Sequence, residues 1–182
     1  MKKSLFIASI ASVALMSSAA YSQTVGVGTT KGGFTNQAGQ SLSKVVSQNT
    51  KIQMRSQPFG GSSVYVPAMN AGKLEFALVN ELEAFYAVTG TGIYPGRKHP
   101  NLRVVSATIP FRVATFARKS SNIRTLKDLK GKRVPSGWAS QKIIIPLMNA
   151  QLANAGLTYD DVIKVPVASV VKSANVFAEG KA

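Results

Sequence analysis

The sequence predicts an α/β protein in which the strands of mostly parallel sheets alternate with helices that cover both faces. Short apolar runs such as 24–28 and 74–79 alternate with amphipathic stretches of helical period. Loops rich in Gly, Ser and Thr follow strands at residues 29–35, 59–63 and 136–140. Ligands of parallel α/β sheets bind beyond the carboxyl ends of the strands, so these three loops are the expected binding edge.

The first 22 residues have the pattern of a secretory signal peptide. Two lysines precede an apolar core at residues 5–16, which is too short for a stable membrane anchor. Small residues occupy the −3 and −1 positions before Gln23. We therefore expect export to the periplasm, with cleavage near Ser22 and Gln23.

Residues 23–110 are expected to form a first α/β lobe. Strands are predicted at 24–28, 51–55, 74–79 and 102–107, and helices at 36–48, from about 66 to 71, and at 81–88. Thr35 or Asn36 would cap the first helix. The second helix would start near Val66, because Pro67 belongs in a first turn. The first helix would bury its apolar residues Ala38, Leu42, Val45 and Val46.

Residues 111–182 are expected to form a second α/β lobe. Strands are predicted at 112–117, 132–135 and 163–167, and helices at 141–155 and 169–178. Thr125 and Thr158 each precede an Asp by three residues, which is a capping signature. Pro146 would either kink its helix or delay the start of that helix. The last helix would bury Val170, Ala174 and Phe177.

The final residues predict that the second lobe is incomplete. In the first half, a helix, Gly72 and Lys73 lead into the strand 74–79. The same helix–Gly–Lys order recurs at Gly180 and Lys181 with no strand after it. We expect a truncated chain; a natural terminus on a frayed helix is the alternative.

The composition limits the classes of function. The chain is 45% apolar and 16% charged, which suits one folded domain or two small ones. Its formal net charge is +15, but the basic residues cluster only at 97–98 and 127–133, without zinc-ligand spacing or an RNP-like motif, so nucleic-acid binding is not expected. Acidic small molecules, an acidic membrane surface or no dedicated partner at all would equally explain the charge. The absence of cysteine excludes thiol chemistry and disulfides.

The sequence contains no catalytic or cofactor motif of the common kinds. Dinucleotide, Walker A and nucleophile-elbow patterns are absent. The single histidine, His99, stands beside a proline in a polar stretch and is expected to be exposed. Glu81 and Glu83 would point in different directions on a helix, so they do not form an acid–base pair. We therefore expect a binding protein rather than an enzyme, with no metal and no cofactor.

Four blocks in order give the chain a family resemblance. GVGTTKGGFTNQAGQSLSKVV, PFGGSSVYVPAMNAGKLEFALVNE, LKDLKGKRVPSG and GLTYDDV resemble the TAXI-family solute-binding proteins of TRAP transporters. The resemblance covers residues 25–182. It implies a type II periplasmic-binding-protein fold with two α/β lobes, which closes on a small ligand and presents it to a membrane permease.

Carried over by position, the resemblance implies ligand contacts on all three loops and after the third strand. These residues are Thr29, Thr30, Gly33, Phe34, Thr35, Gly60, Gly61, Ser62, Ser63, Asn80, Ser136, Gly137, Trp138 and Ser140. Phe34-Thr35 replaces a Tyr pair that is frequent in the family, and residues 138–141 replace a Pro-Gly-Ser-Gly-like loop. Lys31 could add charge or simply be solvated, and Trp138 could stack on ligand or pack between lobes.

The implied function is that of a monomeric periplasmic receptor for a small organic acid or amino acid, such as glutamate or 2-oxoglutarate. The receptor would deliver this ligand to the membrane permease of a TRAP transporter. The alternative is a periplasmic ligand-sensing module of the same fold, coupled to a signalling partner.

Overall fold

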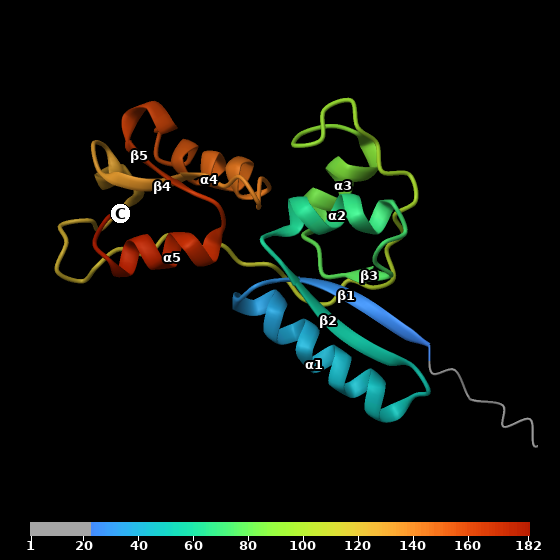
Figure 1. Ribbon diagram of the computed structural model, residues 1–182. Coiled ribbons are helices and arrows are strands. Elements are labelled where there is room, and N and C mark those ends of the chain that lie inside the picture. Colours follow the sequence, from blue (N-terminus) through green and yellow to red (C-terminus); the bar gives the residue numbers. More distant parts are fainter. Residues whose placement is uncertain (1–22) are drawn as a thin grey trace, which may run out of the picture.

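The computed structural model describes residues 23–182, whose strands form two parallel sheets (Figure 1). The first sheet has the order β2-β1-β3, and the second pairs β4 with β5. The strands are β1 (Thr24–Thr30), β2 (Gln53–Phe59), β3 (Phe76–Ala77), β4 (Arg133–Gly137) and β5 (Ile163–Val167). We call residues 24–101 the first unit and residues 118–182 the second unit. The predicted α/β class with parallel strands is confirmed, and the predicted signal peptide lies outside the described residues.

The helices flank the sheets. They are α1 (Gly33–Asn49), α2 (Ser62–Asn70), α3 (Glu81–Thr89), α4 (Ile144–Ala153) and α5 (Val170–Ala178), with short 3₁₀ turns η1 (Leu126–Leu129) and η2 (Tyr159–Asp161). In Figure 1, α1 lies on one side of the first sheet, and α2 and α3 lie on the other. No helix within residues 23–182 is both long enough and apolar enough to cross a membrane.

The predicted buried face of α1 is only partly correct, because Ala38 and Val46 are half-buried while Leu42 and Val45 are exposed. The helix packs on the first sheet through the small buried residues Gly39 and Ser43. A Cβ on Gly39 would lie 2.2 Å from Cγ2 of Thr29, so the close approach to β1 leaves no room for a larger residue. The apolar side chains of Leu42 and Val45 instead point outward and are 39% and 56% exposed.

The start of α1 also differs from the prediction. Gly32 occupies the N-cap position and makes no side-chain cap, so α1 begins before Thr35 and Asn36. Those two side chains bond back to Thr30: Asn36 Nδ2 donates to its carbonyl at 3.0 Å, and the Thr35 and Thr30 hydroxyls lie 2.5 Å apart. They therefore hold the turn between β1 and α1 rather than cap the helix.

The second helix starts earlier than predicted. It begins at Ser62 and continues through Pro67, which costs one backbone hydrogen bond. Tyr65 and Val66, which are 1% and 0% exposed, pack into the core of the first unit. Burial of these two side chains offsets the lost hydrogen bond.

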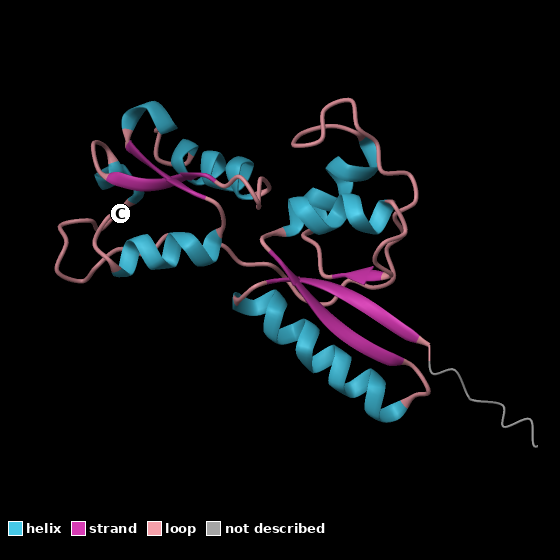
Figure 2. Ribbon diagram, viewed as in Figure 1, coloured by secondary structure: helices cyan, strands magenta, loops and turns pink. Residues whose placement is uncertain are grey.

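The strands predicted at 102–107 and 112–117 are absent. Residues 103–117 form an exposed connection between the two units (Figure 2), in which Val104 and Phe116 are 82% and 80% exposed. A strand is stable only when its backbone groups pair with a neighbour. None of the described strands pairs with these segments, so their alternating pattern joins no sheet.

Several local predictions are confirmed. Both capping boxes form, with the Asp128 carboxylate accepting from the Thr125 backbone at 2.7 Å and that of Asp161 from Thr158 at 2.9 Å. The helix α4 starts at Ile144, so Pro146 lies in its first turn. Of the two predicted effects of Pro146, the later helix start is therefore the one observed.

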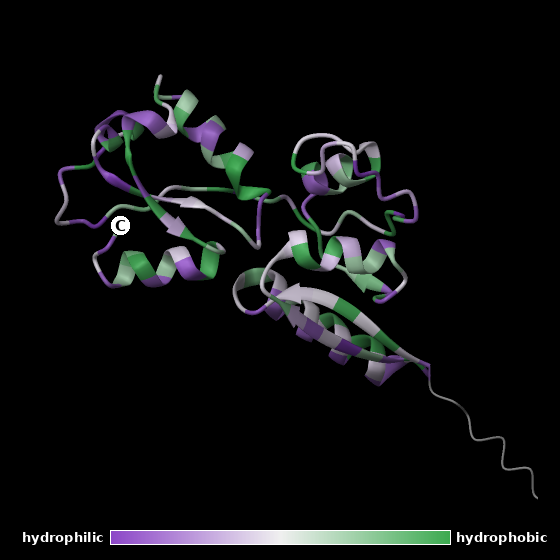
Figure 3. Ribbon diagram, turned by 45° about the horizontal axis from the view of Figure 1, so that its top comes forward, coloured by the Kyte–Doolittle hydropathy of each residue, from purple (hydrophilic) through white to green (hydrophobic). Residues whose placement is uncertain are grey.

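The predicted face of α5 is only partly correct. Much of this helix is hydrophobic (Figure 3), but Val170 and Ala174 are exposed. The half-buried side chains are instead Ser173, Val176 and Phe177.

Candidate functional site

The strand-end loops of the two units meet. A Cβ built on Gly61 would lie 2.0 Å from the carbonyl oxygen of Ser140. The backbone N–H of Lys142 donates to Ser63 Oγ at 3.0 Å, and a Cβ on Gly32 would lie 3.4 Å from Val171 of α5. The second and third predicted loops therefore face each other across the junction, and the first loop lies beside α5.

In the first loop, the hydroxyl groups already have partners. Thr29, which is fully buried, lies with its Oγ1 3.2 Å from Ser56 Oγ, and Thr30 Oγ1 donates to the Gly32 carbonyl at 2.6 Å. Gly33 has a φ of +74°, and the side chain of Phe34 is 53% exposed. These residues shape the turn, and their ligand contacts stay a prediction.

Two other predicted positions support local structure. Asn80 caps α3, since its Oδ1 accepts from the Leu82 N–H at 3.0 Å. Ser136 and Gly137 are the last two residues of β4 rather than loop residues, and Ser136 is buried.

Trp138 packs between the units. It is 4% exposed and belongs to an apolar cluster with Ile144 and Val167 of the second unit. Leu82 and Tyr86 of the first unit pack against the same cluster. The packing alternative for Trp138 therefore describes the structure, and the backbone of Trp138 has a positive φ of 49°.

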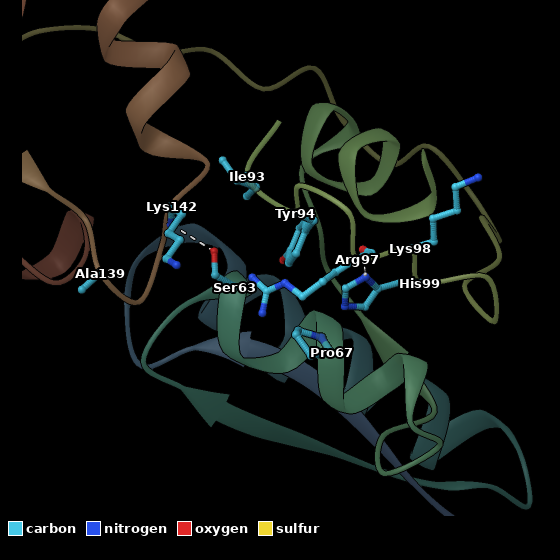
Figure 4. A pocket seen from close by; sticks show the side chains of 9 residues that line it. All are labelled: Ser63, Pro67, Ile93, Tyr94, Arg97, Lys98, His99, Ala139 and Lys142. Atoms are coloured by element: carbon cyan, nitrogen blue, oxygen red, sulfur yellow. Dashed lines mark hydrogen bonds between the residues drawn. The ribbon is translucent and has the colours of Figure 1, made fainter. Parts of the chain in front are cut away.

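A cavity of about 420 Å³ lies at the junction and is lined from both units (Figure 4). Its lining residues are Ser63, Pro67, Ile93, Tyr94, Arg97, Lys98, His99, Ala139 and Lys142. Ser63 is the predicted site residue among them. In Figure 4 the Lys98 side chain points away from the group formed by Ser63, Tyr94 and Arg97.

Most of the lining comes from residues 93–99, which follow α3 and lie outside the three predicted binding loops. His99 was expected to be exposed, but it is 7% exposed and packs edge-on against Tyr94 at 4.8 Å between ring centroids. Its Nδ1 lies 3.0 Å from the Arg97 carbonyl oxygen. The one signal available in the sequence was the Arg97–Lys98 cluster beside an aromatic residue and a histidine.

A buried carboxylate lies behind the cavity wall. Glu83 of α3 is 0% exposed, and its Oε1 accepts hydrogen bonds from Ser63 Oγ at 3.2 Å and from the Tyr94 hydroxyl at 2.9 Å. Its Oε2 and the nearby Ser62 Oγ make no hydrogen bond of normal geometry. Burial raises the pKa of Glu83, and the hydroxyls of Ser62, Tyr94 and Ser63 oppose that rise. Burial and then the Glu83 charge raise the pKa of Tyr65 and Tyr94.

This carboxylate should make stability depend on pH in a defined direction. The pKa of Glu83 is raised above its ordinary value of 4.5, so its stabilising contribution is complete below that value and is lost as pH rises through the native pKa. Glu83→Gln should therefore gain stability relative to wild type as the pH rises from 4.5 toward neutral. Urea unfolding across this range measures the trend. Glu81→Gln, at an exposed position of the same helix, is the matched control. If the difference in unfolding free energy between Glu83→Gln and wild type did not change with pH, the expectation would be contradicted.

Comparison with known protein families places the chain. A model described as the NMT1-like family matches residues 25–182. The chain belongs to the NMT1-like family. NMT1-like proteins are of the periplasmic substrate-binding type, with a periplasmic-binding-protein-like fold. The family is one of binding proteins rather than enzymes. Within residues 23–182, no group of three His, Asp or Glu side chains is placed to hold a metal ion.

Proposed function

We propose that this NMT1-like protein is a periplasmic solute receptor that captures a small carboxylate or amino acid between its two units. In this proposal it delivers the ligand to the permease of a TRAP-type secondary transporter, as the resemblance to TAXI proteins implies. The observation that carries the binding step is the cavity at the junction, which draws cationic side chains from both units, Arg97 from the first and Lys142 from the second.

The chemistry of the cavity suits a small acid. Arg97 can pair with a carboxylate through two parallel hydrogen bonds, and Lys142 adds a second positive charge from the opposite unit. Pro67, Ile93 and Ala139 supply an apolar lining for the carbon skeleton. A ligand held in this way bridges the units, so its binding favours their closed arrangement. The strand-end loops at Gly60, Gly61 and Ser140 then close the edge of the cleft.

Calorimetric titration of the exported protein with glutamate, 2-oxoglutarate and related acids tests the proposal. Arg97→Ala should weaken binding of any acid that binds by about tenfold or more, because a charge-assisted hydrogen-bond pair is lost. Lys98→Ala removes an equal charge from a side chain that points away from the cavity centre, and it should bind nearly as wild type. Failure of every acid to bind, or equal binding by Arg97→Ala, would contradict the proposal. Uptake by cells that carry a TRAP permease, with and without the receptor, tests delivery.

A further inference from the structure

The hydrogen-bonding direction of two cavity residues is fixed by Glu83. The Ser63 and Tyr94 hydroxyls both line the cavity, and both donate their single proton to Glu83 Oε1. This direction does not depend on the charge of Glu83: if a proton resides on the unpartnered Oε2, then Oε1 remains an acceptor. Oε2–H would in that state face Ser62 Oγ, the other buried oxygen without a hydrogen bond.

Because their protons are committed, Ser63 and Tyr94 can offer the cavity only oxygen lone pairs. The Lys142 N–H uses one lone pair of Ser63 from the second unit, which holds this hydroxyl in place. The Arg97 and Lys142 side chains offer the cavity only donors. The hydroxyl oxygens of Ser63 and Tyr94 therefore present hydrogen-bond acceptors to the cavity, and the cationic side chains present donors.

We infer that the site selects acids that carry a hydrogen-bond donor beside the carboxylate, namely 2-hydroxy or 2-amino acids, over the matching 2-oxo acids, and that Glu83 is the positioning residue that sets this preference. The inference rests on the proposed function. A 2-hydroxyl or ammonium group can donate to Ser63 Oγ or to the Tyr94 oxygen. A 2-oxo group would instead set its own lone pairs against theirs, so the remaining lone pairs of the two hydroxyl oxygens would have no donor.

Matched acids of one carbon skeleton give the test. In calorimetric titration, 2-hydroxyglutarate should bind about tenfold more tightly than 2-oxoglutarate, and lactate more tightly than pyruvate, since one neutral hydrogen bond is gained and one lone-pair clash is avoided. Equal or stronger binding of the 2-oxo acids by the wild-type protein would overturn the inference. Failure of all four acids to bind would instead count against the proposed function, so the two failures are distinguishable.

Variants then test the part played by Glu83. Glu83→Gln keeps an oxygen acceptor and can donate to Ser62, so it should retain the preference, whereas Glu83→Leu frees both hydroxyl protons and should reduce or reverse it. A role in packing alone would lower stability without changing the ratio of the two affinities. Tyr94→Phe retains the ring and removes one acceptor oxygen, and it should shrink the preference even if Glu83→Leu does not fold. An affinity ratio unchanged in Tyr94→Phe, or in folded Glu83→Leu, would overturn the role of this network.

Discussion

Gly61→Ala is expected to prevent the two units from closing and to weaken solute binding by more than tenfold. The new Cβ would lie 2.0 Å from the Ser140 carbonyl oxygen and 2.6 Å from its carbonyl carbon, which are backbone atoms that cannot rotate away. Gly61 has an extended backbone with φ 174°, which alanine adopts without strain. The effect should therefore come from the contact between the units and leave each unit folded.

Gly60→Ala is the matched control for this experiment. A Cβ at that position would lie 3.4 Å from the Ser140 side chain, an ordinary contact that a small adjustment accommodates. The chain contains no cysteine, so labels at Gln48→Cys and Lys172→Cys, on exposed residues of α1 and α5, report the separation of the units by energy transfer. Wild-type separation and affinity in Gly61→Ala would show that this contact does not limit closure.

Leu152→Ala is expected to lower the free energy of unfolding of the second unit by about 2–5 kcal/mol. The side chain is 0% exposed and lies among Leu129, Val134 and Val162. The substitution removes its transfer free energy and leaves a cavity that the surrounding strands cannot fill. Urea unfolding followed by far-ultraviolet circular dichroism measures the loss.

Leu42→Ala tests whether the structure or the hydrophobic pattern of the sequence describes α1 correctly. Leu42 belongs to the apolar face that the periodicity of α1 predicts to be buried, yet it is 39% exposed. Leu42→Ala should therefore cost at most about 0.5 kcal/mol, as for an ordinary surface position. A loss comparable with that of Leu152→Ala would mean that the outward face of α1 is covered in solution.

The two helices show why the sequence predicts some elements well and others poorly. Helix α4 has one large buried leucine on an inward face and a proline in its first turn, so periodicity and local sterics agree. In α1 the distance of closest approach to β1 decides the inward face, and it favours Gly39 over any apolar residue. That distance depends on tertiary packing, about which the hydrophobic periodicity of the sequence carries no information. The capping boxes at Thr125 and Thr158 were predictable because all their partners lie within three residues.

The sequence predicts which strand-end loops come together at the junction, but it does not predict which residues line the cavity there. Gly61, Ser63 and Ser140 follow strands, so the rule that ligands bind at strand ends brings them to the junction. Tyr94, Arg97 and His99 lie in a loop rich in Gly and Pro that has no periodic pattern. Their meeting with Lys142 depends on how the two units pack, which involves residues far apart in the chain.

The exposed connection at residues 103–117 has a consequence for the thermodynamics of closure. A covalent tether makes the encounter of the two units intramolecular, with an effective local concentration on the order of millimolar. The contact between Ser63 and Lys142 can then be far too weak to hold two separate molecules and still keep the cleft shut for much of the time. Closure should also be insensitive to dilution, so that occupancy by solute, and not protein concentration, controls how often the cleft is open.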